Sequence, residues 1–109
     1  MTTYLLLYRS EQSPAERMAD ATPEQAEAGM QAWMAWAGKV GDALVDLGSP
    51  VTAAGSVGAG PGGGLHIGGF SMMEAASVDE LRGLLDGHPH LQSDTDGIEI
   101  LEYLPVPGT

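Results

Sequence analysis

The sequence has no cysteine, only four lysine and arginine residues in total, and no long apolar run. Without cysteine, disulfide bonds, thiolate metal sites and a cysteine nucleophile are excluded. Fifteen acidic residues against four basic ones give a formal net charge of -11, which repels nucleic-acid phosphates and anionic lipid head groups. No segment approaches the roughly 18 apolar residues of a membrane helix. We therefore expect a cytoplasmic protein that binds neither nucleic acid nor membrane.

The hydrophobic fraction of 43% over 109 residues predicts a folded chain rather than a disordered acidic one. This length suits one domain spanning residues 1–109, which buries only roughly two-thirds of the surface that its unfolded form exposes. Little room is left for a deep private cavity. We therefore expect any ligand site to be small, or to be shared with another chain.

Turn and capping signals divide the first half of the chain. Residues 4–8 form an apolar run of the length of a strand buried on both faces, and residues 10–21 are a polar connection. A long helix is predicted from Thr22, which opens a capping box, to about Leu47, where Gly48 supplies a stop signal. Its apolar stripe places Trp33 in the core, and we expect Trp36 at the edge of the core or in an interface.

The second half of the chain is predicted to hold two strands, a short helix and a last strand. Residues 51–57 form a weakly specified strand, and residues 58–64 a glycine-rich connector. Residues 65–74 regain strand character, a helix runs from 77 to 87, and residues 98–104 close the chain. The order βαββαβ predicts an α+β, ferredoxin-like fold, a four-stranded antiparallel sheet with both helices on one face.

The first strand carries apolar residues on both faces, although the helices of such a fold cover only one. A second copy of the chain commonly covers the other face in small α+β proteins. We therefore expect a homodimer, joined face to face through the sheet.

Several segments, in this order and spacing, resemble the YCII-related proteins, also called DGPF or YciI-like. They are residues 4–8 (YLLLY), 33–36 (WMAW), 46–48 (DLG), 68–75 (GGFSMMEA), 87–91 (GHPHL) and 97–100 (GIEI). The resemblance covers most of the chain and implies a dimeric α+β barrel of ferredoxin-like protomers. It implies little about activity, because that family is largely uncharacterised.

Two features depart from the family pattern. The Asp-Gly-Pro-Phe signature of one branch is replaced by Gly-Pro-Gly-Gly-Gly at residues 60–64. Other branches resemble YciI proteins with a histidine in the first helix and an aspartate elsewhere, proposed as an acid-base pair. The first helix of this chain has no histidine, so that pair does not carry over.

The chain has three histidines, the side chains that titrate nearest to neutral pH. His88 and His90 flank Pro89, which favours an extended backbone, so both imidazoles are expected to face the same way with Asp94 and Asp96 nearby. Three interpretations follow: a helix C-terminal cap, which the sequence favours, general acid-base catalysis by His88, His90 and Asp94, and a metal site of nitrogen and oxygen ligands.

Acidic residues crowd the last quarter of the chain, and after Lys39 only Arg82 is basic. We expect this negative field to raise the pKa values of the two nearby histidines and to favour a cationic partner. The acidic residues are Asp86, Asp94, Asp96, Glu99 and Glu102.

The first functional hypothesis is a dimeric small-molecule-binding protein or cofactor-free enzyme of unknown substrate. Its pocket would lie between sheet and helices, with His88 or His90 at the rim. The predicted lining residues are Tyr8, Trp33, His66 and Phe70. One alternative is a non-catalytic dimeric interaction or regulatory module, and another is a metal-dependent enzyme that uses His88 and His90. Arg9 would hold an anion or pair with an internal acid.

Overall fold

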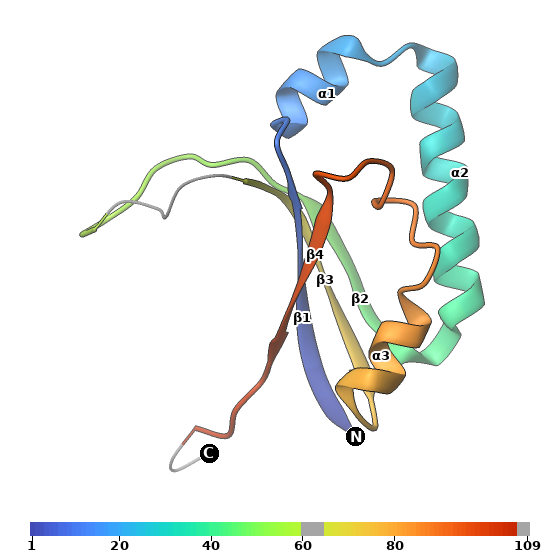
Figure 1. The fold of residues 1–109 in the computed structure, drawn as a ribbon, viewed down its shortest axis with the longest axis vertical. Helices are drawn as coiled ribbons and strands as arrows, with labels where there is room; N and C mark the ends of the chain where they lie inside the picture. Colours follow the sequence, from blue (N-terminus) through green and yellow to red (C-terminus); the bar gives the residue numbers. More distant parts are fainter. Residues whose placement is uncertain (60–64, 107–109) are drawn as a thin grey trace.

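The computed structural model describes residues 1–59 and 65–106, in which a four-stranded antiparallel sheet is packed against helices on one face (Figure 1). The strand order is β2-β3-β1-β4. The strands are β1 (Thr2–Ser10), β2 (Leu44–Pro50), β3 (His66–Ala75) and β4 (Gly97–Glu102). The helices are α1 (Pro14–Asp20), α2 (Pro23–Val40) and α3 (Val78–Leu84), with a short 3-10 turn η1 (Gly41–Ala43). The ferredoxin-like α+β class is thereby confirmed.

The predicted helix end and second strand are wrong. α2 ends at Val40, because Gly41 adopts a positive φ of 58° that closes the helix. The residues predicted as its last turn form β2, and residues 51–57 are coil rather than a strand. Gly48 lies inside β2 at a φ of 82°, where a Cβ atom would come 1.7 Å from the carbonyl oxygen of Phe70. The glycine therefore permits close strand packing instead of stopping a helix.

Residues 10–21, which were predicted to be a polar connection, contain the additional helix α1. The Ser13 side chain accepts a hydrogen bond from the Glu16 backbone N–H at 3.2 Å, which caps the first turn. The capping box at Thr22 is confirmed, since the Gln25 N–H donates to Thr22 Oγ1 at 3.1 Å and the Thr22 N–H to Gln25 Oε1 at 2.9 Å. Ser77 caps α3 by accepting the Glu80 N–H at 3.1 Å, but the Glu80 carboxylate accepts the Ala76 N–H instead of completing a capping box.

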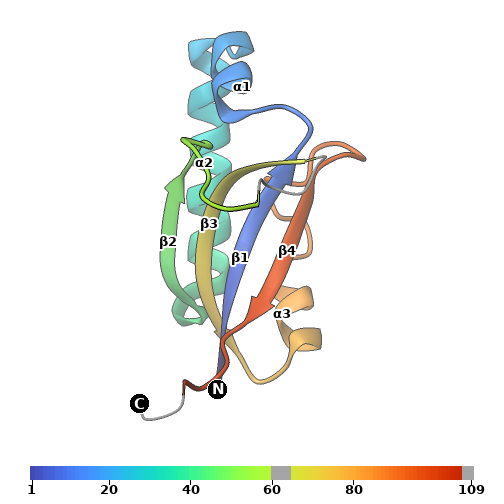
Figure 2. The same cartoon turned by 90° about the vertical axis from the view of Figure 1, so that its left-hand side faces the viewer.

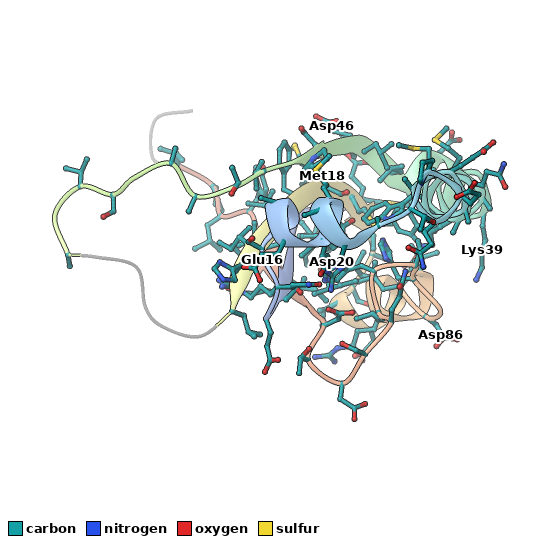
Figure 3. All side chains as sticks on the ribbon, turned by 90° about the horizontal axis from the view of Figure 1, so that it is seen from above. Glu16, Met18, Asp20, Lys39, Asp46 and Asp86 are labelled. Carbon is teal, nitrogen blue, oxygen red and sulfur yellow. The ribbon has the colours of Figure 1, made fainter. Side chains whose placement is uncertain are left out.

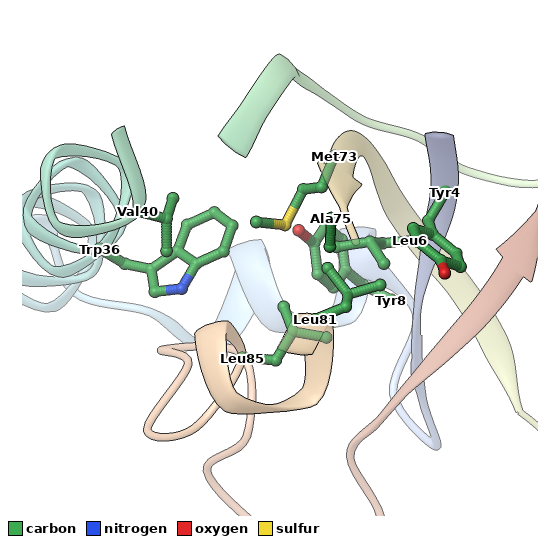
Figure 4. Close-up of a cluster of buried hydrophobic side chains, with 9 residues drawn as sticks. All are labelled: Tyr4, Leu6, Tyr8, Trp36, Val40, Met73, Ala75, Leu81 and Leu85. Carbon is green, nitrogen blue, oxygen red and sulfur yellow. The ribbon is translucent and has the colours of Figure 1, made fainter. Parts of the chain in front are cut away.

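The core lies between the helices and the face of the sheet that they cover (Figure 4). Alternate residues of β1 point into it, so the helix-covered face is buried along the whole strand. The buried apolar side chains are Tyr4, Leu6, Tyr8, Trp36, Val40, Met73, Ala75, Leu81 and Leu85.

The expected positions of the two tryptophans are reversed. Trp36 is buried and its indole N–H donates to the Leu84 carbonyl at 3.0 Å, whereas Trp33 is only partly buried. Burial of Trp36 is favourable because the last residue of α3 supplies a hydrogen-bond acceptor for its indole N–H. Part of the predicted apolar stripe of α2 does not face the core, because Met30 and Met34 are 63% and 55% exposed.

No helix covers the other face of the sheet in the part of the chain that the structure describes, as Figure 2 shows with the helices behind the strands. On this open face, Leu5 pairs with Met72 and Leu101, and Leu7 pairs with Phe70. Residues 51–59 and 103–106 also extend to this side, away from the helices (Figure 1).

Several charged side chains lie on the outside of the layers. Viewed from above, Lys39 of α2, Asp46 of β2 and Asp86 after α3 project away from the core (Figure 3). Within residues 1–59 and 65–106, the helices lack the length and apolar character needed to cross a bilayer.

Candidate functional site

The buried imidazole of His88 lies in a group of aromatic rings between β1 and α2. Its ring centroid is 4.3 Å from that of Trp36, 4.6 Å from Trp33 and 5.1 Å from Tyr8. The chain reaches this position because Gly87, at a φ of 71°, reverses direction after α3. His88 is 2% exposed. We call Tyr8, Trp33, Trp36, His88 and His90 the aromatic–imidazole cluster.

The hydrogen bonds of His88 fix which ring nitrogen carries its proton. The His90 backbone N–H donates to His88 Nδ1 at 2.9 Å, so Nδ1 is the acceptor and the proton of the neutral ring is on Nε2. His88 Nε2 is buried and has no hydrogen-bond partner among the described residues. His88 therefore holds an unused N–H donor inside the protein.

The expected rise of the histidine pKa values is wrong for His88. Burial, and to a smaller extent the charge of the neighbouring His90, lower its pKa to about 4. The acidic residues predicted to raise it are far less influential, because Asp86 and Asp94 are exposed to solvent while the ring is surrounded by apolar groups. His88 is consequently neutral at neutral pH.

His90 is held by a backbone group of β1. Its Nε2 lies 2.9 Å from the carbonyl oxygen of Arg9. A carbonyl oxygen only accepts, so Nε2 carries the proton and the lone pair of the neutral ring is on Nδ1. The ring centroid of His90 is 5.3 Å from that of Tyr8, which places both imidazoles beside the same phenol.

A chain of hydroxyl groups fixes the Tyr8 ring. The Tyr8 hydroxyl donates to Ser71 Oγ at 2.7 Å, and Ser71 Oγ donates to the Leu47 carbonyl at 2.6 Å. Burial raises the pKa of Tyr8, although the hydrogen bond with Ser71 acts in the opposite direction. Tyr8 is therefore a neutral phenol in a fixed orientation.

A cleft of about 330 Å³ lined by polar side chains lies between α1 and the loop before β4. Arg17 spans it, because its guanidinium donates to Ser10 Oγ at 2.8 Å and pairs with the Asp96 carboxylate. The Asp96 side chain is 1% exposed and accepts the backbone N–H groups of Gln92 and Ser93. Burial acts to raise the pKa of Asp96, but these hydrogen bonds and the Arg17 charge outweigh it and hold that pKa below its usual value.

The structure brings together Tyr8, Trp33, His88 and His90, four of the residues singled out from the sequence. The sequence did not assign Ser71 or Arg17 to a site, and it placed Trp36 at the edge of the core or in an interface rather than in the pocket. The sequence could have indicated Ser71, because it is the one hydroxyl residue among the inward-facing residues of β3.

Phe70 and His66 do not join the cluster. Phe70 pairs with Leu7 on the open face, because alternation puts it opposite to the inward-facing Ser71. His66 pairs with Ser10 at the start of β3, where its side chain is exposed. A register shift between Tyr8 and Arg9 breaks the strict alternation on which the prediction for His66 depended.

Asp94 is exposed, whereas His88 and His90 are buried. The neighbouring Asp96 pairs with Arg17 instead. In the described part of the chain, no group of three or more His, Asp or Glu side chains is arranged to hold a metal ion. His88 Nδ1 and His90 Nε2 are both engaged with backbone groups, so a metal ion at either atom would have to displace a hydrogen bond.

Arg9 pairs with an internal acid, one of its two predicted roles. Its Nε donates to Glu99 Oε1 at 2.6 Å on the open face. The pair occupies one end of that face, beyond Leu7.

No family model matches the chain, and no curated protein matches it. Among solved structures, it is similar to 5-chloro-2-hydroxyhydroquinone dehydrochlorinase from Burkholderia phenoliruptrix AC1100, in complex with 2,5-dihydroxybenzoquinone. The likeness covers 88% of this chain and 90% of that chain, at 20% sequence identity and a TM-score of 0.48. Membership of the YCII-related family stays a prediction.

Proposed function

We propose that the protein is a small-molecule-binding protein or cofactor-free enzyme, that its site is the aromatic–imidazole cluster, and that it works as a homodimer. The unused His88 Nε2–H carries the first part of this proposal. A buried donor without a partner costs about 1–3 kcal/mol, so such groups in native proteins require an explanation. A ligand oxygen that accepts this hydrogen bond provides one.

The side chains around His88 determine the shape and polarity of the ligand that fits. Two indoles and a phenol surround the donor, which favours a flat, mainly apolar molecule with one oxygen acceptor. The ligand enters by displacing Trp33, which is the partly buried ring of the cluster and lies on α2 at its outer edge.

Intrinsic fluorescence tests this proposal, because both tryptophans of the chain belong to the cluster. The protein is titrated with indan-1-one, a flat neutral ketone, and with benzoate, a flat anion. We expect indan-1-one to change the emission saturably, and His88→Phe to weaken its binding about tenfold, the equivalent of one lost hydrogen bond.

His66→Phe is the matched control, because it makes the same substitution at an exposed histidine outside the cluster. It leaves the affinity unchanged. Binding that His88→Phe does not weaken, or emission that neither probe alters, overturns the proposed site.

The open face supports the homodimer. Leu5, Leu7 and Met72 form an apolar centre that the helices leave uncovered. The occupant is a second copy of the chain, because the apolar centre is a place where two chains of net charge -11 can meet without bringing acidic groups together.

Sedimentation velocity at micromolar concentration tests the dimer. We expect the wild type to sediment as a dimer and Met72→Glu to raise the dissociation constant by about tenfold or more, because it buries unpaired charge. Met34→Glu, the same change on the exposed side of α2, leaves the dimer intact. A monomeric wild type, or equal effects of the two variants, overturns this part of the proposal.

A further inference from the structure

The two histidines of the cluster leave opposite kinds of atom free. The N–H of His90 is used by the Arg9 carbonyl, so its free atom is the lone pair on Nδ1, an acceptor. The lone pair of His88 is used by the His90 backbone N–H, so its free atom is the Nε2–H, a donor. Both rings have the same tautomer, but their hydrogen bonds expose a base on one and an acid on the other.

The free atoms also differ in accessibility. Among the side-chain nitrogen and oxygen atoms of the described residues, His88 Nε2 is the one that is fully buried and has no hydrogen-bond partner. His90 Nδ1 has no hydrogen-bond partner in that part of the chain either, but it is not fully enclosed. A base that solvent can reach is able to exchange its proton, whereas the buried donor keeps its own.

We infer that His90 acts as a general base and His88 as a neutral hydrogen-bond donor in proton transfer on a small, uncharged carbonyl compound. This inference rests on the proposed function and gives the cluster a reaction class. The two imidazoles are neighbours in the cluster, since their ring centroids lie 5.1 Å and 5.3 Å from that of Tyr8.

The protonation state of His88 supports the role of a neutral donor. Burial holds its pKa at about 4, so it does not become a cation at neutral pH. A neutral imidazole can stabilise a developing oxyanion by hydrogen bonding without giving up its proton. An anionic substrate fits less well, because the aromatic–imidazole cluster includes no lysine or arginine and the chain has a net charge of -11.

The chemical step needs no cofactor or oxidant. His90 Nδ1 takes a proton from the carbon next to the carbonyl group, and the electrons of that C–H bond form the C=C bond of an enolate. The His88 N–H stabilises the enolate oxygen. The protonated His90 then returns the proton to the same carbon or to another atom of the substrate, which gives exchange with solvent or isomerisation.

Deuterium exchange into indan-2-one tests this step. This flat ketone has acidic C–H groups on both sides of its carbonyl group, and proton NMR in D2O measures their loss. We expect the wild-type protein to accelerate exchange over buffer, and His90→Gln to lower the acceleration by about 100-fold, the lower range for a general base. Glutamine keeps an N–H for the Arg9 carbonyl but has no basic nitrogen.

The affinity for indan-2-one separates this inference from the proposed function. His90→Gln should lower exchange far more than it lowers tryptophan quenching, whereas His88→Phe should reduce both quenching and exchange. If indan-2-one binds but wild type and His90→Gln exchange it equally, the base role is wrong and the binding site stands. If quenching is absent for every probe, the binding site fails and the inference fails with it.

A second measurement does not depend on a ligand. Two-bond nitrogen–proton NMR spectra of the imidazole rings distinguish the tautomers of neutral histidines. We expect the proton on Nε2 in both His88 and His90. A proton on Nδ1 of His90 removes its free lone pair and overturns the assignment, whatever the probes show.

Discussion

The helix-covered face and the open face of the sheet divide polar and apolar groups in opposite ways. The covered face packs against the buried core, yet this buried region also encloses Ser10, Ser71, His88 and His90. The open face is accessible, yet its centre is apolar and its ion pair of Arg9 and Glu99 lies toward one end. Polar groups where water is excluded indicate a ligand or a proton-transfer site, and apolar groups where water is present indicate a partner chain.

The largest expected difference between the faces concerns two neighbouring leucines of β1. Leu6 is fully buried, so Leu6→Ala should lower the free energy of unfolding by about 2–5 kcal/mol. Leu5 is half-buried on the open face, and Leu5→Ala should cost less than half as much in the monomer. Urea unfolding at concentrations below the dimer range measures both. Equal losses would mean that the two faces do not differ in burial as described.

The next effect is a dependence of stability on pH that arises from the covered face. The folded pKa of His88 is about 4 and the reference value is 6.5, so the unfolded chain binds a proton that the folded chain excludes. Stability should therefore fall as the pH is lowered from about 6.5 to about 4, by about 3 kcal/mol at most. Asp96 acts at lower pH, because its stabilisation is present above its usual pKa of 3.8.

Urea unfolding at several pH values measures this dependence. His88→Phe should remove most of the slope in that interval, and His66→Phe should retain it. A slope that survives in His88→Phe would assign the effect to other groups.

The smallest expected difference concerns one serine on each face. Ser71→Ala removes the acceptor of the buried Tyr8 hydroxyl and should cost about 1–3 kcal/mol. Ser49 pairs with Phe70 in the sheet but is exposed, so Ser49→Ala should change stability by less than about 0.5 kcal/mol. Thermal unfolding of the two variants is sufficient to compare them. Similar melting temperatures would show that the Tyr8 hydroxyl finds another partner.

The sequence predicted the fold class because capping and alternation are local signals. Thr22 and Ser77 cap their helices as expected, and the apolar run at residues 4–8 forms a strand, although only one of its faces is fully buried. β2 escaped prediction because Leu44 and Leu47 also fit the helical stripe of α2, and because two register shifts remove the alternation of this edge strand. Only the positive φ of Gly41 decides between helix and strand there.

The sequence predicted part of the candidate site, because some of its residues stand out by local composition. The density of histidines around Pro89 identified His88 and His90, and the aromatic residues Tyr8 and Trp33 were found with them. Phe70 was assigned to the wrong face, since the face of a strand residue depends on a register that the sequence does not reveal. Trp36 and Ser71 join the site through contacts with α3 and β1.

The sequence by itself determined the excess of acidic residues, the caps of the helices and the two apolar faces of β1. Only the tertiary structure decided the chemistry of the histidines. His90 is 81 residues from the Arg9 carbonyl that fixes its proton, and the rings that bury His88 come from β1 and α2. The local acidic sequence predicted a raised pKa, but the pKa of a buried group follows the solvation and hydrogen bonds supplied by distant neighbours.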